Sequence, residues 1–185
     1  RIDMLAASAE DEAFRKARSL AVMRAAATAY GWEPRPSPVA NRARGDVLVF
    51  LPGAAEIRRC CDAIAVGAGD PSLRVLPLYG DLDAAAQDAA LRPAPAGLRK
   101  VVVATNLAET SLTIEGVTVV IDSGLARVSR FDSGLGLSRL STVRIARDNA
   151  DQRAGRAGRL GPGAAFRLWT EATHRGLALT RAPEI

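Results

Sequence analysis

Three arginines recur at every third position of a short stretch near the C-terminal end of the chain. The stretch is DNADQRAGRAGRLGPG over residues 148–163, and the arginines are Arg153, Arg156 and Arg159. On a helix, residues three apart lie on neighbouring parts of the surface, so this spacing predicts a row of guanidinium groups. Such a row can bind phosphates and stabilise the negative charge that develops on a phosphoryl group during its transfer. An ordinary solvated basic helix remains the alternative.

The residues around these arginines favour the first interpretation. Asn149 or Asp148 can cap the start of a helix, which places Gln152 in an early turn. Gly155 and Gly158 stand between the arginines, although each glycine costs a helix about 1 kcal/mol relative to alanine. Because the chain uses alanine freely elsewhere, the glycines indicate that something packs close to the backbone. A polyphosphate is the partner that the positive charge favours.

A second polar stretch, ATNLAETSLTIEGV, occupies residues 104–117. It begins where an apolar run ends, at Thr105 and Asn106, and it continues with hydroxyl and acidic side chains. Hydroxyls and free backbone N–H groups at the end of a strand can bind phosphate oxygens. Taken alone, however, the same residues are typical of a capped helix that connects two strands.

Both stretches depend on a regular scaffold of short apolar runs. Runs that are apolar on both faces and alternate with helical patterns predict a parallel sheet that helices cover on both sides. Ligands gather at the carboxyl ends of the strands in such sheets, so the turns after each run are candidate binding segments. The predicted strands are residues 46–52, 73–80, 100–106, 117–124 and 164–170, and the predicted helices are 54–65 and 83–91, the latter with Asp81 or Asp83 as its cap.

Residues 125–144 do not follow this alternation of strands and helices. Their side chains alternate in character on either side of a DSG turn at 132–134, which is typical of an antiparallel hairpin. The hairpin carries several arginines, which either bind an anionic partner or form an ordinary solvated surface. These arginines are Arg127, Arg130, Arg139 and Arg144.

The composition of the chain limits its class. Of its 185 residues, 48% are hydrophobic, which allows a packed core, and the net charge of +5 is a weak argument for a nucleic-acid partner. Residues 1–30 have a helical pattern, and the prolines in 31–38 predict a linker before a domain that starts near Gly45. No apolar run reaches the ~20 residues that span a bilayer, and the adjacent Cys60 and Cys61 suit neither a metal site nor a mutual disulfide. We therefore expect a cytoplasmic protein without a membrane partner, and at least one cysteine buried in a helix.

One expected motif is absent from the sequence. A phosphate-binding loop of the form G-x-x-x-x-G-K-[ST] occurs nowhere in the chain. If the chain handles a nucleotide, it therefore supplies only half of the site. The glycine fingerprint of a Rossmann-type oxidoreductase is absent as well, which argues against that class of enzyme.

Together the two polar stretches resemble a known family. QRAGRAGR at 152–159 and ATNLAETSLTIEGV at 104–117 are similar to motifs in the second RecA-like domain of DEAH-box helicases. Further similarities lie in VLVFLPGAAEI at 47–57, LPLYGDL at 76–82 and FRLWTE at 166–171. The segments LRPAP at 91–95 and FDSGLGLSRL in the hairpin resemble the bacterial HrpB-type branch of the family.

This resemblance implies the fold and the domain organisation. The fold would be α/β, with a RecA-like parallel sheet flanked by helices on both faces and an antiparallel β-hairpin as an insertion. The RecA-like domain would span residues 45–172. Residues 1–44 would form a helical N-terminal segment and a proline-rich linker, and residues 173–185 would begin a winged-helix region.

The resemblance also implies roles for the matching residues. Arg156 and Arg159 would be arginine fingers on the phosphates of ATP, and Gln152 would position the attacking water. Many relatives have an aromatic residue that stacks on the base where this chain has Leu91, which implies weak discrimination among nucleoside triphosphates. The other nucleotide contacts would be Ser111, Thr113, Glu115 and Arg153, and the contacts with the nucleic-acid backbone would be Gly53, Thr105, Asn106 and Arg130.

By the same resemblance, the chain would be the second motor domain of an ATP-dependent helicase. It would bind ATP with Mg²⁺ jointly with a first RecA-like domain, and it would hold single-stranded RNA or DNA without regard to sequence. Alone it would be inactive, because closure of the two domains completes the ATP site and couples hydrolysis to movement. The alternative function is a freestanding RecA-like module that binds single-stranded nucleic acid without catalysis.

Overall fold

The computed structural model describes residues 45–68, 71–110, 112–132, 134, 136–159 and 161–180. The predicted N-terminal helix and linker, Ser111 and the end of the predicted winged-helix region at 181–185 lie outside the described residues.

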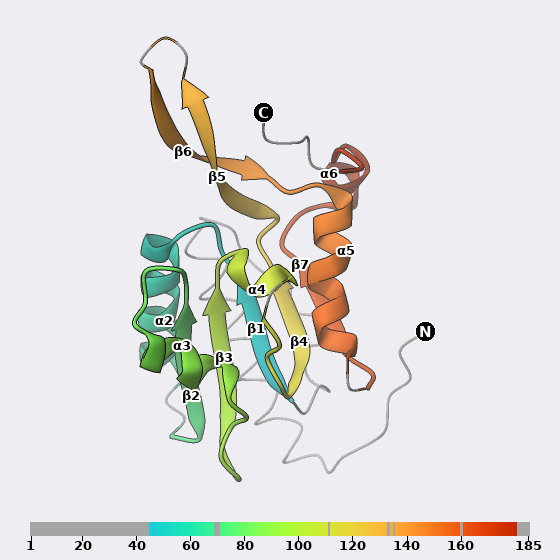
Figure 1. The fold of residues 1–185 in the computed structure, drawn as a ribbon. Helices are drawn as coiled ribbons and strands as arrows, with labels where there is room; N and C mark the ends of the chain where they lie inside the picture. Colours follow the sequence, from blue (N-terminus) through green and yellow to red (C-terminus); the bar gives the residue numbers. More distant parts are fainter. Residues whose placement is uncertain are drawn as a thin grey trace.

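The apolar runs form one parallel sheet, as their pattern predicted (Figure 1). The strands are β1 (Asp46–Phe50), β2 (Leu73–Leu78), β3 (Arg99–Ala104), β4 (Val117–Asp122) and β7 (Ala164–Arg167). Their order across the sheet is β2-β3-β1-β4-β7, which places β1 at the centre with β3 and β4 on either side. Every residue of β1 is buried, which explains why its sequence is apolar on both faces.

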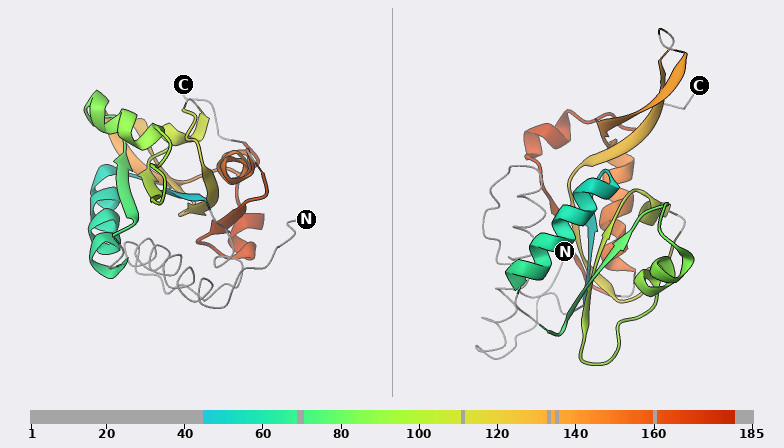
Figure 2. Two further views of the ribbon diagram at one scale, coloured as in Figure 1. Left: turned by 90° about the horizontal axis from the view of Figure 1, so that it is seen from below. Right: turned by 90° about the vertical axis from the view of Figure 1, so that its left-hand side faces the viewer.

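Helices cover both faces of this sheet, which confirms the predicted α/β class (Figure 2). The helices are α2 (Ala54–Ala68), α3 (Ala84–Leu91), α4 (Leu107–Thr110), α5 (Arg147–Gly155), α6 (Glu171–Arg175) and the 3₁₀ helix η2 (Arg156–Gly158). On one face, α2 packs Ile57 and Ile64 into a core with the strands. On the other face, α3, α4 and η2 contribute Ala90, Ala108 and Ala157 to a second core. None of the described helices combines the length and the apolar character that a membrane span requires.

The predicted antiparallel hairpin is confirmed. It consists of β5 (Leu125–Asp132) and β6 (Leu137–Arg144), and it extends away from the parallel sheet (Figure 1). Arg130 lies directly opposite Arg139, and both residues are exposed. Because like charges directly opposite each other on a hairpin repel, this pair favours an anion as its partner.

Helix α3 is held by polar groups at both ends. At its start the carboxylate of Asp83, one of the two predicted caps, accepts a hydrogen bond from the backbone N–H of Ala86 at 2.8 Å. At its end the buried ammonium of Lys100 donates to the carbonyl oxygens of Ala90 at 3.0 Å and Arg92 at 2.5 Å. Burial lowers the pKa of Lys100, although nearby acidic groups oppose this effect. The cation satisfies carbonyls that the last turn of a helix leaves free.

The predicted cap of α5 is wrong. The helix begins at Arg147, before both Asn149 and Asp148, and its preceding residue Ala146 offers no side-chain cap. Instead, the backbone N–H groups of Arg147 and Asp148 donate to the carbonyl oxygens at positions 178 and 179, at 2.9 and 3.2 Å. The segment that follows α6 therefore caps α5 through its backbone. The resemblance places this segment at the start of a winged-helix region.

The two cysteines are expected to resist alkylation in the folded chain. Cys60 is buried in α2, as predicted, and burial raises the pKa of its thiol to about 12. Cys61 is half-buried, and burial raises its pKa to about 11. Because the thiolate is the reactive form, iodoacetamide at pH 8 should modify neither thiol in the native chain and both in denaturant, as counted by mass spectrometry. Rapid labelling of the native chain would contradict this packing.

Candidate nucleotide and nucleic-acid site

The three arginines of the C-terminal stretch do not form an exposed row. Arg153 is only 1% exposed and Arg156 is 7% exposed, whereas Arg159 is open to solvent. The expectation of three parallel surface guanidinium groups is therefore wrong. Helix α5 ends at Gly155, and the change to 3₁₀ geometry in η2 alters the direction in which the following side chains point.

Arg153 is engaged by groups of its own chain. Its guanidinium binds Asp122 at 2.8 Å and Glu109 at 3.2 Å, and it donates to the carbonyl oxygen of Leu125 at 3.2 Å. It also lies 4.8 Å from the centre of the Phe50 ring, a cation–π distance. Arg153 was expected to contact the nucleotide, but these partners occupy its charge and bury it. It joins α5 to α4, β4 and the start of the hairpin instead.

The partner carboxylates of Arg153 are deeply buried. Burial raises the pKa of Asp122, while the charge of Arg153 and a hydrogen bond from Gly124 N–H at 2.9 Å oppose this effect. The second oxygen of Glu109 accepts a hydrogen bond from the side-chain amide of Asn149. Asn149 was expected to cap α5, and its amide holds Glu109 instead. A buried charge needs such compensation, so this cluster fixes α4 against α5.

Arg156 also binds the segment that contains α4. Its Nε donates to the carbonyl oxygen of Glu109 at 2.9 Å, and its NH1 donates to that of Leu112 at 2.6 Å. Burial and then the charge of Arg159 lower the pKa of Arg156, and Glu109 opposes them. Arginine remains protonated at any physiological pH, so the group stays a cation poised next to this loop.

The exposed members of the predicted nucleotide site lie beyond this buried cluster. Arg159 donates from NH1 to the hydroxyl of Thr113 at 3.1 Å, and both residues are exposed. Glu115 and Gln152 are exposed as well. The structure therefore brings Arg159 and Thr113 into contact, although they are 46 residues apart in the chain.

The glycines between the arginines lie against open space. A Cβ atom built on Gly155 or Gly158 would meet no atom of the described residues within 4 Å. The predicted close approach to their backbone is therefore not made within the described part of the chain. The space is available to a ligand or a partner outside it.

The residues predicted to hold nucleic acid lie at the carboxyl ends of β1 and β3. Thr105 is half-buried and Asn106 is exposed, directly after β3. Gly53 follows β1 but is buried, because the ion pair of Glu56 with Arg127 lies over it, within 3 Å of where its Cβ would be. Asn106 thus offers a free surface at this edge of the sheet, and Gly53 does not.

The predicted residues fall into two groups toward opposite ends of the sheet. The nucleic-acid group comprises Thr105, Asn106 and Arg130, and the nucleotide group comprises Thr113, Glu115, Gln152, Arg156 and Arg159. Thr105 and Asn106 follow the carboxyl end of β3, on the side from which the hairpin and Arg130 extend (Figure 1). Thr113 and Glu115 precede the amino end of β4, which runs parallel to β3 in the same sheet. The short segment of α4 and the loop after it connect the two groups.

Glu109 is the residue that the sequence analysis missed. It was counted only as one polar residue of the second stretch, yet its side chain and its carbonyl oxygen bind three residues of α5 and η2. Glu109 has no basic residue within one helical turn of it in the sequence. This absence could have indicated a cationic partner from a distant part of the chain. The arginine-rich stretch was the obvious candidate.

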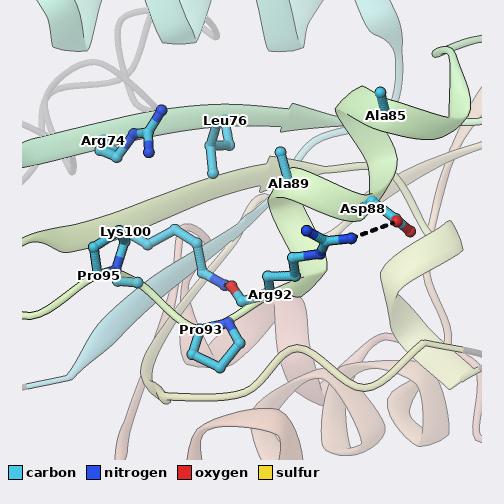
Figure 3. Close-up of a pocket in the computed structure, with 10 residues that line it drawn as sticks. Arg74, Leu76, Ala85, Asp88, Ala89, Arg92, Pro93, Pro95 and Lys100 are labelled. Atoms are coloured by element: carbon cyan, nitrogen blue, oxygen red, sulfur yellow. Dashed lines mark hydrogen bonds and ion pairs between the residues drawn. The ribbon is translucent and has the colours of Figure 1, made fainter.

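A separate pocket of about 360 Å³ lies beside the edge strand β2, between α3 and the proline-containing loop after it (Figure 3). Its charged lining includes Arg92, which pairs with Asp88 at 3.2 Å, and Lys100, which holds the end of α3. None of the predicted site residues lines this pocket. Its main cations already serve α3, so it is distinct from the arginine site.

The chain offers no metal site of its own among the described residues. No group of three or more His, Cys, Asp or Glu side chains gathers closely enough to hold a metal ion there. Glu115, one of the implied nucleotide contacts, is exposed. A metal ion that accompanies ATP would therefore take most of its ligands from the phosphates, from water and from groups outside the described residues.

Known proteins are similar to this chain in sequence and in fold. The model of the helicase conserved C-terminal domain family matches residues 37–161. The ATP-dependent RNA helicase HrpB of Escherichia coli is 48% identical over 141 residues, which are 76% of this chain and 17% of that protein. The pre-mRNA-splicing factor ATP-dependent RNA helicase prp22 of Schizosaccharomyces pombe is 46% identical over 147 residues, which are 76% of this chain and 13% of that protein.

A solved structure agrees with these sequence matches. The crystal structure of the E. coli DExH-box NTPase HrpB has a TM-score of 0.73 and 39% sequence identity to this chain, and the match covers 98% of this chain and 20% of that one. The chain thus spans less than a quarter of the length of these relatives. The motifs, the parallel sheet with its hairpin and these matches together show that the chain belongs to the helicase conserved C-terminal domain family, as the C-terminal helicase domain of the DEAH-box, HrpB type.

Proposed function

We propose that this chain is the second motor domain of an ATP-dependent helicase that acts on RNA. The observation that carries the proposal is the open surface around Gly155, Gly158 and Arg159, next to the buried cation of Arg156. Positive charge lies there beside an accessible backbone, and none of the described residues fills the space. A nucleotide held by a first RecA-like domain in the same protein would complete this surface.

This arrangement supports a role for each residue of the nucleotide group. Arg159 reaches the surface and would contact the phosphates directly, and Arg156 would join it by exchanging its carbonyl partners for phosphate oxygens. Arginines supplied to a transferring phosphoryl group stabilise the charge that develops there. Gln152 would position the attacking water, Thr113 would sense the nucleotide state, and Glu115 would lie near the ribose or the metal-bound water. Mg²⁺ would arrive with ATP and lower the charge of its phosphates.

The nucleic-acid group would hold a single strand by its phosphates. Asn106 is exposed at the end of β3 with Thr105 beside it, and Arg130 and Arg139 form a cation pair on the projecting hairpin. Contacts of this kind carry no base specificity, so binding would tolerate any sequence. RNA is the favoured substrate because the related helicases named above act on RNA. The cytoplasm is the proposed location.

A freestanding binding module is the second candidate. The exposed arginines of the hairpin and Asn106 would serve a protein that only holds single-stranded nucleic acid, since binding needs no hydrolysis. The open surface at Gly155 and Gly158 beside Arg159 favours the motor-domain function, because a module that only binds nucleic acid does not need a free nucleotide-binding surface there.

ATP hydrolysis by this chain and by the full-length protein separates the two functions. We expect the chain alone to be inert, and the full-length protein to hydrolyse ATP faster when a single-stranded RNA oligomer is added. A DNA oligomer of the same sequence is the matched control for the choice of nucleic acid. Hydrolysis by the chain alone would contradict the divided site. RNA binding without any RNA-stimulated hydrolysis in the full-length protein would favour the module.

A further inference from the structure

Glu109 lies in α4, between the nucleic-acid group and the nucleotide group of the site. We propose that Glu109 is a positioning residue that couples the binding of single-stranded nucleic acid to the placement of Arg156, and thereby to ATP hydrolysis. This coupling rests on the proposed motor function. Three sets of contacts carry it, through the side chain, the backbone N–H and the carbonyl oxygen of this one residue.

The side chain of Glu109 fastens α4 to α5. Glu109 is only 8% exposed, and each of its carboxylate oxygens has a donor. Arg153 Nε donates to one oxygen at 3.2 Å, and the amide of Asn149 donates to the other. Both donors come from α5, so a displacement of α4 must break this buried pair or move α5 with it.

The backbone N–H of Glu109 connects it to the end of β3. This N–H donates to the carbonyl oxygen of Asn106 at 2.9 Å, and the N–H of Ala108 donates to that of Thr105 at 3.2 Å. Asn106 and Thr105 are the residues proposed to hold the nucleic-acid backbone. A bound single strand of nucleic acid that displaces Thr105 and Asn106 would therefore also displace Glu109.

The carbonyl oxygen of Glu109 connects it to Arg156. Both Nε and NH2 of Arg156 donate to this oxygen, while NH1 donates to Leu112. A guanidinium whose N–H groups donate to carbonyl oxygens cannot donate the same hydrogen bonds to a phosphate. Movement of the Glu109 carbonyl away from Arg156 would release the fork that a phosphate can accept.

The network also reaches the hairpin. Arg153, which binds the Glu109 carboxylate, donates to the carbonyl oxygen of Leu125, the first residue of β5. Nucleic acid on the hairpin and nucleic acid at Asn106 therefore act on the same buried cluster. A neutral substitution, Glu109→Gln, can remove the charge of this carboxylate with almost no change in volume.

The test is the ATP turnover of the full-length protein with and without a single-stranded RNA oligomer. For Glu109→Gln, we expect turnover without RNA to stay near the wild-type value and the maximal stimulation by RNA to fall by about fivefold or more. The RNA concentration that gives half-maximal stimulation should not change, because Asn106 and Arg130 are intact. The double variant Glu109→Gln with Asn149→Asp should recover the stimulation. In it, the new amide can donate to the new carboxylate and still accept from Arg153.

A matched control and several further outcomes decide the proposal. Asp151→Asn breaks an exposed ion pair of α5 with Arg167, at 2.6 Å, and should leave the stimulation unchanged. Wild-type stimulation in Glu109→Gln would overturn the coupling, as would an equal loss of basal and stimulated turnover or a double variant that stays uncoupled. If Glu109→Gln does not fold, Arg153→Lys keeps the charge but loses the fork, and full stimulation in that variant would overturn the proposal. Failure of both variants to fold would make the role of Glu109 purely structural.

Failure of the coupling can be told apart from failure of the motor function. If the wild-type full-length protein shows no RNA-stimulated hydrolysis, the proposed function itself is wrong. If it is stimulated and Glu109→Gln is stimulated equally, only the role of Glu109 is wrong.

Discussion

The Arg156→Ala variant of the full-length protein is expected to lose RNA-stimulated ATP turnover by about 10³-fold or more, which is the usual effect of removing an arginine finger. The cation lies beside the open surface of Gly155 and Gly158, where the phosphates would approach. RNA binding, measured by fluorescence anisotropy, should persist, because the nucleic-acid group is elsewhere. A wild-type rate in this variant would contradict the assignment and make the basic stretch a binding surface.

A loss of structure must be separated from a loss of chemistry in this variant. Alanine at this position leaves the carbonyl oxygens of Glu109 and Leu112 without their donor, at a cost of about 1–3 kcal/mol. Arg159→Ala is the cleaner companion, because Arg159 is exposed and its hydrogen bond within the described part of the chain is to the hydroxyl of Thr113. It should lose turnover to a similar extent with little change in melting temperature. Arg92→Ala, which removes an exposed arginine of α3, is the control and should retain full activity.

The Gly163→Ala substitution is expected to destabilise the chain by about 3 kcal/mol or more, since it forces backbone atoms apart. An added Cβ would lie 2.0 Å from the carbonyl oxygen of Ala157 and 2.5 Å from its carbonyl carbon, in η2. Rigid backbone cannot turn aside as a flexible side chain can. The melting temperature, followed by circular dichroism, should fall by about 6 °C or more for a domain of this size.

Gly155→Ala is the matched control for this prediction. Its added Cβ would meet no atom of the described residues, and its backbone is helical, so alanine should be neutral or stabilise by up to about 1 kcal/mol. An equal melting temperature for the wild type and Gly163→Ala would show that η2 is not held as described. If Gly155→Ala keeps its stability but loses ATP turnover in the full-length protein, that result would support a close approach of the nucleotide to this backbone.

The scaffold could be predicted from the sequence because each element carries its own local pattern. Runs such as VVVA at the end of β3 are apolar on every side chain and rich in β-branched residues, which is typical of a short strand covered on both faces. The alternation around the DSG turn likewise gave the hairpin, and Asp83 stands directly before α3 with a side chain suited to a cap. These patterns depend on neighbours within a few residues, so one chain is enough to recognise them. The motifs around Arg156 and Asn106 were found for the same reason.

The start of α5 depended on residues far away in the chain. The sequence offered Asn149 and Asp148 as caps, but the free N–H groups bind the carbonyl oxygens of Ala178 and Leu179. A backbone carbonyl is present at every position, so no residue type marks it as a cap. Only the tertiary structure brings the segment after α6 to this helix.

The burial and the partners of each arginine were also decided by tertiary packing. Helix α5 has few apolar residues, and these are alanines, so its sequence does not indicate which side faces the sheet. Arg153 and Arg159 are alike as residues, yet one is buried between Glu109 and Asp122 and the other reaches solvent. The sequence by itself determined that the chain carries the sheet, the hairpin and the motifs of a helicase C-terminal domain. Which arginine binds a carboxylate and which reaches solvent was decided by the tertiary structure, because a guanidinium pairs with whichever anion the fold brings within reach.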